Sequence, residues 1–265
     1  MAARSTLRGV VLRTGVLAAG YAGIRWLFNL LPSADQNFFE QSAPPTGDPE
    51  LDALLPAKYY RTDAFAGVFS ADDAAIRAVL PTPELHPAHL PGGQAVVMIS
   101  AFNYLETSIG PYGEVMIAVP CVLGHDAPPL LPLLMEARYP GFGYFVLHLP
   151  VTSRIALEGG RRLANYPKFI GDMAFERQPD YQRVRLTEGD SPILTLTIHQ
   201  RGLPLKDNRP VHVYTARDPD LLKTAIPACS VYQVGLMPGW GHLALGTHPI
   251  AEQLRGLDVD RKSVV

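Results

Sequence analysis

Lys168 is the residue of this chain whose neighbours could make its own side chain reactive. It lies between the pair Tyr166-Pro167 and the pair Phe169-Ile170. A lysine amine is a nucleophile only when it is neutral, and burial among apolar groups disfavours the charged ammonium form. If the fold leaves this amine in water, Lys168 is an ordinary surface charge, as most lysines are. The sequence therefore supports two hypotheses for Lys168, a reactive centre or a solvated cation.

The residues before Lys168 predict the element that positions it. A helix can begin at Ser153, and it contains the glycine pair Gly159-Gly160. Pro167 disfavours helical geometry at the preceding residue, so we expect the helix to end by Asn165 and Lys168 to lie on the first residues of a strand. A side chain held between a helix end and a strand can be placed with the accuracy that a reactive group requires.

The rest of the chain predicts mainly antiparallel β structure with a few helices. Apolar and polar residues alternate at 183–186 and 194–199, and this period of two is typical of strands with one buried face. The 25 prolines and 23 glycines favour many short strands joined by turns. We predict an α+β fold, with strands at 58–69, 94–104, 114–123 and 143–151, a helix over 71–80 whose cap is Ser70, and a final helix that starts at Thr247.

Four segments are expected along the chain. Residues 1–31 contain four arginines, an apolar run and no acidic residue, which indicates a membrane anchor or interfacial helix, a secretory signal or a transit segment. A helix packed on a partner subunit is an alternative, and membrane association would use residues 9–31. Residues 32–55 predict a linker, 56–258 the folded domain and 259–265 a tail. The protein is accordingly expected to be membrane-associated or cytoplasmic.

Charge and metal-ligand patterns narrow the classes of partner. Four of the 23 basic residues lie in the acid-free residues 1–34, so the remaining chain carries 19 basic against 25 acidic residues. An acidic body of this kind is a poor match for nucleic acid, whose phosphates require clustered basic side chains. His86 and His89 lie in a proline-rich loop without a ligand cluster, and Cys121 and Cys229 resemble small buried hydrophobes. We expect no nucleic-acid partner and no metal.

Three segments carry a resemblance to a known family. The run Gly160-Arg-Arg-Leu-Ala-Asn-Tyr-Pro-Lys168 resembles the segment of acetoacetate decarboxylases in which the first lysine after the proline forms a Schiff base. The turn Ile109-Gly-Pro-Tyr-Gly-Glu114 is similar to the turn with that family's active-site glutamate. The C-terminal stretches 241–245 and 248–254 resemble its last strand and helix. The resemblance extends roughly from Pro56 to Asp258.

The resemblance implies a fold and a mechanism. The fold would be a closed, cone-shaped antiparallel β-barrel with a few flanking helices, assembled into large homo-oligomers. Lys168 would form an imine with a keto acid, without a cofactor, and Glu114 would handle protons or position water. Read without the resemblance, Glu114 is a solvated glutamate at the start of a strand.

The resemblance also indicates residues around the substrate. Arg61 lies in the region of the family's active-site arginine, although an ungapped match places Thr62 there, and Ile99 replaces a second family glutamate. Tyr112, Tyr166 and Phe169 complete the expected substrate-binding set. Phe169 stands where the family often has a second lysine. Without that neighbouring cation, burial must disfavour the ammonium form of Lys168, so we predict a dry pocket around its amine.

The function predicted on this basis is decarboxylation of a β-keto acid, either acetoacetate-like or more hydrophobic, with release of CO2 and a ketone. Two alternatives remain open. The same imine could support an aldol-type or dehydration reaction in an altered pocket, or an apolar barrel could bind a hydrophobic small molecule without catalysis.

Overall fold

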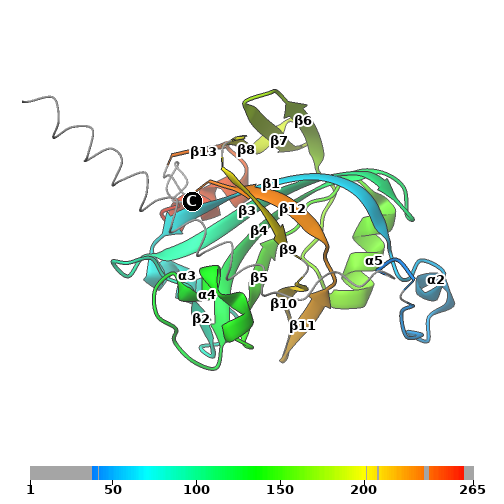
Figure 1. The fold of residues 1–265 in the computed structure, drawn as a ribbon, viewed down its shortest axis with the longest axis horizontal. Coiled ribbons are helices and arrows are strands. Elements are labelled where there is room, and N and C mark those ends of the chain that lie inside the picture. The colour runs from blue at the N-terminus through cyan, green and yellow to red at the C-terminus, as the bar shows by residue number, and fades with distance from the viewer. Residues whose placement is uncertain (1–37, 41, 201, 208, 236–238, 260–265) are drawn as a thin grey trace, which may run out of the picture.

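The structure is a computed structural model that describes residues 38–40, 42–200, 202–207, 209–235 and 239–259 (Figure 1). The predicted N-terminal segment 1–31, with its candidate membrane stretch 9–31, lies outside these residues. None of the described helices is long and apolar enough to cross a membrane. Membrane attachment through 9–31 and assembly into homo-oligomers therefore stay predictions.

Most of the described chain is β structure in three sheets. A seven-stranded sheet has the order β1-β3-β4-β5-β10-β11, with β2 paired to β4, and only β5 and β10 run parallel. A four-stranded sheet has the order β13-β8-β7-β6, and β12 and β9 form a two-stranded ribbon. The strands are β1 (Tyr59–Ala71), β2 (Leu85–Pro87), β3 (Ala95–Thr107), β4 (Tyr112–Leu123), β5 (Phe142–His148), β6 (Asp172–Arg177), β7 (Tyr181–Glu188), β8 (Ser191–His199), β9 (Leu203–Asp207), β10 (Val211–Arg217), β11 (Asp220–Ile226), β12 (Ser230–Val234) and β13 (Gly241–Leu245).

The predicted α+β class with mainly antiparallel strands is confirmed. None of the described sheets closes on itself, so the closed cone-shaped barrel is not confirmed and stays a prediction. Figure 1 shows the ribbon β9–β12 crossing the face of the large sheet, and the two contribute residues to one hollow described below.

Few helices flank these sheets. They are α2 (Pro49–Asp52), α3 (Asp73–Val79), α4 (Leu131–Leu134), a 3-10 turn (Glu136–Arg138), α5 (Arg154–Ala164) and α6 (Pro249–Gly256). The helix expected after Ser70 is capped by Asp72 instead, because β1 continues to Ala71 and the Asp72 carboxylate accepts the Ala75 N–H. The final helix is capped by His248 rather than Thr247.

Part of the predicted linker packs on the folded domain. Residues 49–52 form the short helix α2, whose N-cap is Asp48. Arg162 of α5 forms ion pairs with Asp48 and, at 3.2 Å, with Glu50. The segment before β1 is thus tied to the helix that precedes Lys168.

Strand β4 has buried residues on both of its faces. Val115, Ile117 and Val119 point into the main core, which also contains residues of β8 and α6. Met116 and Ala118 point to the opposite face, where they pack with residues of β5 and β10. Because side chains alternate along a strand, Glu114 lies on the same face as Met116 and Ala118. The candidate site therefore lies on the face of β4 opposite the main core.

The two cysteines differ in exposure. Cys121 is buried on β4, as expected, whereas Cys229 is exposed, so the expectation of a second buried cysteine is wrong. Cys229 lies in the connection between β11 and β12. Both thiols are free.

Candidate active site

Lys168 and Glu114 form a buried ion pair. The Lys168 Nζ donates to Glu114 Oε2 at 2.7 Å, and the two residues are only 6% and 8% exposed. Removing two charged groups from water is costly, and their contact offsets that cost only while both partners are present. The short contact also gives the ammonium a carboxylate to which it can pass a proton directly.

The backbone around Lys168 is fixed from two sides. Helix α5 starts at its Ser153 cap and ends at Asn165, whose φ of 50° turns the chain out of the helix. The following residues are extended but do not form a regular strand, which corrects the prediction that Lys168 lies on one. They hydrogen-bond to the chain after β5 instead, with Leu149 N–H donating to Pro167 O at 3.1 Å and Val151 N–H to Phe169 O at 2.9 Å.

Arg161 adds a third constraint on this segment. Its guanidinium donates to the carbonyl oxygen of Lys168, at 2.8 Å from Nε and 2.5 Å from an Nη nitrogen. The helix before Lys168 thus holds the backbone of Lys168 itself. We infer that Arg161 positions the lysine rather than contacting a substrate.

Gly160 has no side chain, and this leaves room for the Lys168 side chain to pack against α5. A Cβ atom at Gly160 would lie 2.7 Å from Lys168 Cε and 2.8 Å from its Cδ. Real Cβ contacts are not that short, so any larger residue at this position must displace the lysine stem. At the neighbouring Gly159, a Cβ would meet no atom within 4 Å.

The glycine pair provides a matched test of this packing. Gly160→Ala is expected to lower the turnover number of the reaction that takes place at the Lys168 amine by roughly 10- to 100-fold. A shift of about 1 Å in a reacting group has an effect of that size. Gly159→Ala is expected to leave turnover unchanged and to raise the free energy of unfolding by about 0.5–1 kcal/mol through helix propensity. Turnover and thermal unfolding of both variants check this. Equal turnover in the two variants would show that the lysine stem does not depend on Gly160.

Glu114 is held at its second oxygen by a tyrosine from the neighbouring strand. Tyr104 donates its hydroxyl hydrogen to Glu114 Oε1 at 3.3 Å. The β3–β4 hairpin places Tyr104 opposite Tyr112 and Phe102 opposite Glu114, so these side chains share one face. The two oxygens of Glu114 are therefore divided between an amine and a phenol.

Three tyrosine rings gather beside Glu114. The ring centroid of Tyr104 lies 4.6 Å from that of Tyr59 and 4.7 Å from that of Tyr112. The hydroxyl oxygens of Tyr59 and Tyr112 are 3.1 Å apart. Burial raises the pKa of all three phenols, and the charge of Glu114 raises each further. All three hydroxyls are thus protonated hydrogen-bond donors near neutral pH.

The structure brings together four of the six predicted site residues. Lys168 and Glu114 are in contact, and Tyr112 belongs to the tyrosine cluster. The Lys168 Nζ lies 5.6 Å from the ring centroid of Tyr166, and burial, with the charge of Glu114, raises the pKa of Tyr166 to about 12. A cation at this distance is attracted to the ring face, so Tyr166 forms part of the wall around the amine.

Arg61 and Phe169 do not join this group. Arg61 is exposed on β1, and its side chain makes no hydrogen bond or ion pair with another described residue. Phe169 follows Lys168 in an extended segment, so its side chain points to the opposite side. It packs against the main core and stacks on His248, with ring centroids 6.5 Å apart.

Sequence reasoning missed Tyr59, Tyr104 and Gly160. Tyr104 could have been found from the hairpin centred on residues 107–112. That hairpin pairs Tyr104 with Tyr112, which lies two residues before Glu114 and on the same face of β4. Tyr59 depends on register shifts in β1 between Tyr59 and Thr62, which re-aim side chains and leave no sequence signal.

Metal-ligating groups are sparse in the part of the chain that the structure describes. No cluster of three or more His, Cys, Asp or Glu side chains arranged for a metal occurs there. His86 Nδ1 lies 2.9 Å from Asp126, and His89 Nε2 lies 2.7 Å from Asp73. Each histidine therefore has a carboxylate partner of its own.

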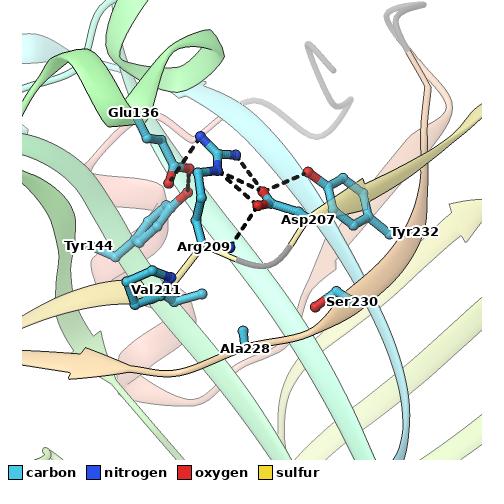
Figure 2. Close-up of a pocket in the computed structure, with 9 residues that line it drawn as sticks. Glu136, Tyr144, Asp207, Arg209, Val211, Ala228, Ser230 and Tyr232 are labelled. Atoms are coloured by element: carbon cyan, nitrogen blue, oxygen red, sulfur yellow. Dashed lines mark hydrogen bonds and ion pairs between the residues drawn. The ribbon is translucent and has the colours of Figure 1, made fainter. Parts of the chain in front are cut away.

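A separate hollow of about 240 Å³ lies between the large sheet and the ribbon β9–β12 (Figure 2). Arg209 binds both carboxylate oxygens of Asp207, and Glu136 lies 4.0 Å from its guanidinium. Tyr144 donates to Glu136 at 3.1 Å, and Tyr232 donates to Asp207 at 3.4 Å. Neither Lys168 nor Glu114 lines this hollow. We interpret the network as a clamp that holds the ribbon on the sheet.

The sequence family follows from comparison of the whole chain. The model of the acetoacetate decarboxylase (ADC) family matches residues 42–263. The chain belongs to the acetoacetate decarboxylase family. This match confirms the resemblance seen in three segments. No curated protein sequence matches the chain.

Solved structures of acetoacetate decarboxylases share this fold. The acetoacetate decarboxylase of Legionella pneumophila subsp. pneumophila str. Philadelphia 1 superposes with a TM-score of 0.53 at 18% identity, covering 78% of this chain and 81% of the other. A second acetoacetate decarboxylase has a TM-score of 0.55 at 21% identity, covering 78% and 82%. The enduracididine biosynthesis enzyme MppR, complexed with pyruvate, has a TM-score of 0.50 at 12% identity, covering 76% and 81%. At these identities the likeness concerns the fold.

Proposed function

We propose that this protein is a decarboxylase of a β-keto acid that works through an imine on Lys168. The observation that carries the proposal is the buried contact between the Lys168 amine and the Glu114 carboxylate, in a chain of the acetoacetate decarboxylase family. A buried lysine beside a proton acceptor is suited to attack on a carbonyl carbon, because it can lose its proton without water.

The first half of the proposed cycle forms the imine. The Lys168 ammonium passes a proton to Glu114 across 2.7 Å, and the neutral amine attacks the ketone carbon. The carbinolamine oxygen then takes a proton from Glu114 and leaves as water. The product is a protonated imine at Lys168, and Glu114 is again a carboxylate.

The second half breaks the carbon–carbon bond. The bond between the carboxylate carbon and the α-carbon breaks, CO2 leaves, and the electron pair forms the enamine as the C=N bond gives its electrons to nitrogen. Glu114, after taking a proton from solvent, protonates the α-carbon. Water then attacks the imine carbon and releases the ketone, so each turnover consumes one proton.

A second candidate function keeps the imine and changes the reaction. The exposure of Arg61 and the presence of Ile99 in place of a second glutamate remove two groups that the resemblance places in the active site. The fold neighbour MppR, which is complexed with pyruvate, suggests that other keto acids can occupy such a site. An aldol-type or dehydration reaction on Lys168 is the alternative that these differences favour.

CO2 release from a panel of β-keto acids separates these functions. We expect release from at least one β-keto acid, from acetoacetate to longer and more hydrophobic members, above the rate of the same acid in buffer. An α-keto acid such as pyruvate serves as the control and is expected to release none. Imine formation with a keto acid and no CO2 from any β-keto acid would favour the second candidate. Neither imine nor CO2 would favour a binding protein without catalysis.

A further inference from the structure

The proposed function leaves one question, which is where the substrate carboxylate binds. Arg61, the expected partner, is exposed on β1. The tyrosine cluster beside Glu114 hydrogen-bonds within itself and to Glu114, and its other described neighbours are Phe102 and the apolar residues Ile109, Val151, Ala156 and Leu157, with no arginine among them. A carboxylate near Lys168 would therefore need neutral hydrogen-bond donors.

The Tyr59–Tyr112 hydroxyl pair supplies such a donor. Two phenols carry two hydroxyl hydrogens, and one of these is used in the 3.1 Å hydrogen bond between them. The other hydrogen has no acceptor among the described residues. A buried or partly buried donor without a protein acceptor requires water or a ligand as its partner, and a carboxylate oxygen is among the strongest acceptors it can have.

A short chain of contacts links this pair to the amine. The Tyr104 ring packs on both Tyr59 and Tyr112, and the Tyr104 hydroxyl reaches Glu114, whose other oxygen holds the Lys168 amine. The hydroxyl pair is thus connected to the reacting nitrogen through Tyr104 and Glu114. The register shifts of β1 between Tyr59 and Thr62 lie immediately beside this cluster.

We propose that the Tyr59–Tyr112 hydroxyl pair is the carboxylate subsite of the imine-forming centre, and this inference rests on the proposed function. The ligand it takes is the carboxylate of a keto acid held by neutral O–H donors without an arginine. Such donors orient the leaving carboxylate but do not give it a permanent counter-cation. As CO2 leaves, the electron pair of the carboxylate moves to the protonated imine and the negative charge on the carboxylate disappears. Neutral donors stabilise that charge in the bound substrate less than an arginine would, so less stabilisation is lost on reaching the transition state.

Phenylalanine substitutions test the subsite because they remove a hydroxyl and keep the ring. The variants are Tyr59→Phe and Tyr112→Phe, and the matched control is Tyr60→Phe, whose side chain is 48% exposed next to Tyr59. Two readouts are needed for each variant. One is kcat/KM for CO2 release from a β-keto acid, and the other is borohydride trapping of Lys168 with a neutral methyl ketone, which has no carboxylate.

We expect Tyr59→Phe and Tyr112→Phe to lower kcat/KM for the acid by roughly 10- to 100-fold, the effect of one hydrogen bond to a charged group. Trapping with the ketone should stay within about twofold of the unsubstituted protein, and Tyr60→Phe should change neither readout. Equal losses with acid and ketone, or no loss with the acid, would overturn the carboxylate assignment while leaving the imine intact. Failure of the unsubstituted protein to trap either compound would overturn the proposed function and this subsite with it.

Discussion

Lys168→Met is expected to lower CO2 release from a β-keto acid by at least about 10³-fold, because methionine keeps the length of the side chain and removes the only group that forms the imine. The measurement is steady-state CO2 release under saturating substrate. A variant that retains more than a tenth of the activity would show that the reaction does not pass through Lys168.

The same substitution also tests the buried ion pair. It leaves the Glu114 carboxylate buried without its cation, and removing one partner of such a pair costs about 3–5 kcal/mol. The double variant Lys168→Met with Glu114→Gln removes both charges and should recover much of that stability while remaining inactive. Denaturant unfolding of the two variants separates a lost nucleophile from a lost fold. Equal destabilisation in both would contradict the coupling between these residues.

Glu114→Gln is expected to have the second largest effect, a fall in kcat of roughly 10²- to 10⁴-fold. Glutamine preserves the shape and can accept the Tyr104 hydrogen bond at its carbonyl oxygen, but it cannot take the proton from Lys168 or deliver one to the enamine. The measurement is kcat for CO2 release together with the rate of imine trapping. Both should fall, because both steps use the same proton acceptor.

Glu106→Gln is the matched control for this prediction. Glu106 lies on β3 opposite Arg61 and is exposed, and its side chain makes no hydrogen bond or ion pair with another described residue. Its substitution removes one acidic charge from the same end of the large sheet without touching the buried pair. We expect unchanged kcat. Equal losses in the two variants would indicate a general charge effect rather than proton transfer by Glu114.

The element that delivers Lys168 could be predicted from sequence because its signals are local. Ser153 caps α5, and Pro167 stops it, so both ends of the helix agree with the prediction. The contact between Lys168 and Glu114 could not be derived in this way, since 54 positions separate them and only the resemblance joined them. Val151, in the chain after β5, bridges to Glu114 on one side and to Ile170 on the other, and this pairing brings Lys168 and Glu114 together.

Sequence reasoning was weakest where side-chain direction and long-range packing decide the structure. Phe169 was expected beside the substrate, yet alternation along an extended segment turns it to the main core when Lys168 faces Glu114. Tyr59 joins the site through irregular pairing in β1, which sequence patterns do not reveal. The closed barrel stays a prediction, because closure depends on how the sheet edges meet rather than on any single strand.

Borohydride trapping tests the central claim most directly. The protein is incubated with a β-keto acid that it decarboxylates, reduced with sodium borohydride, digested and analysed by mass spectrometry. Reduction of the imine is expected to leave the carbon skeleton of the ketone on Lys168 as a secondary amine and to abolish further CO2 release in proportion to the labelling. CO2 release with no substrate-dependent label on Lys168, or with the label on another lysine, would contradict it.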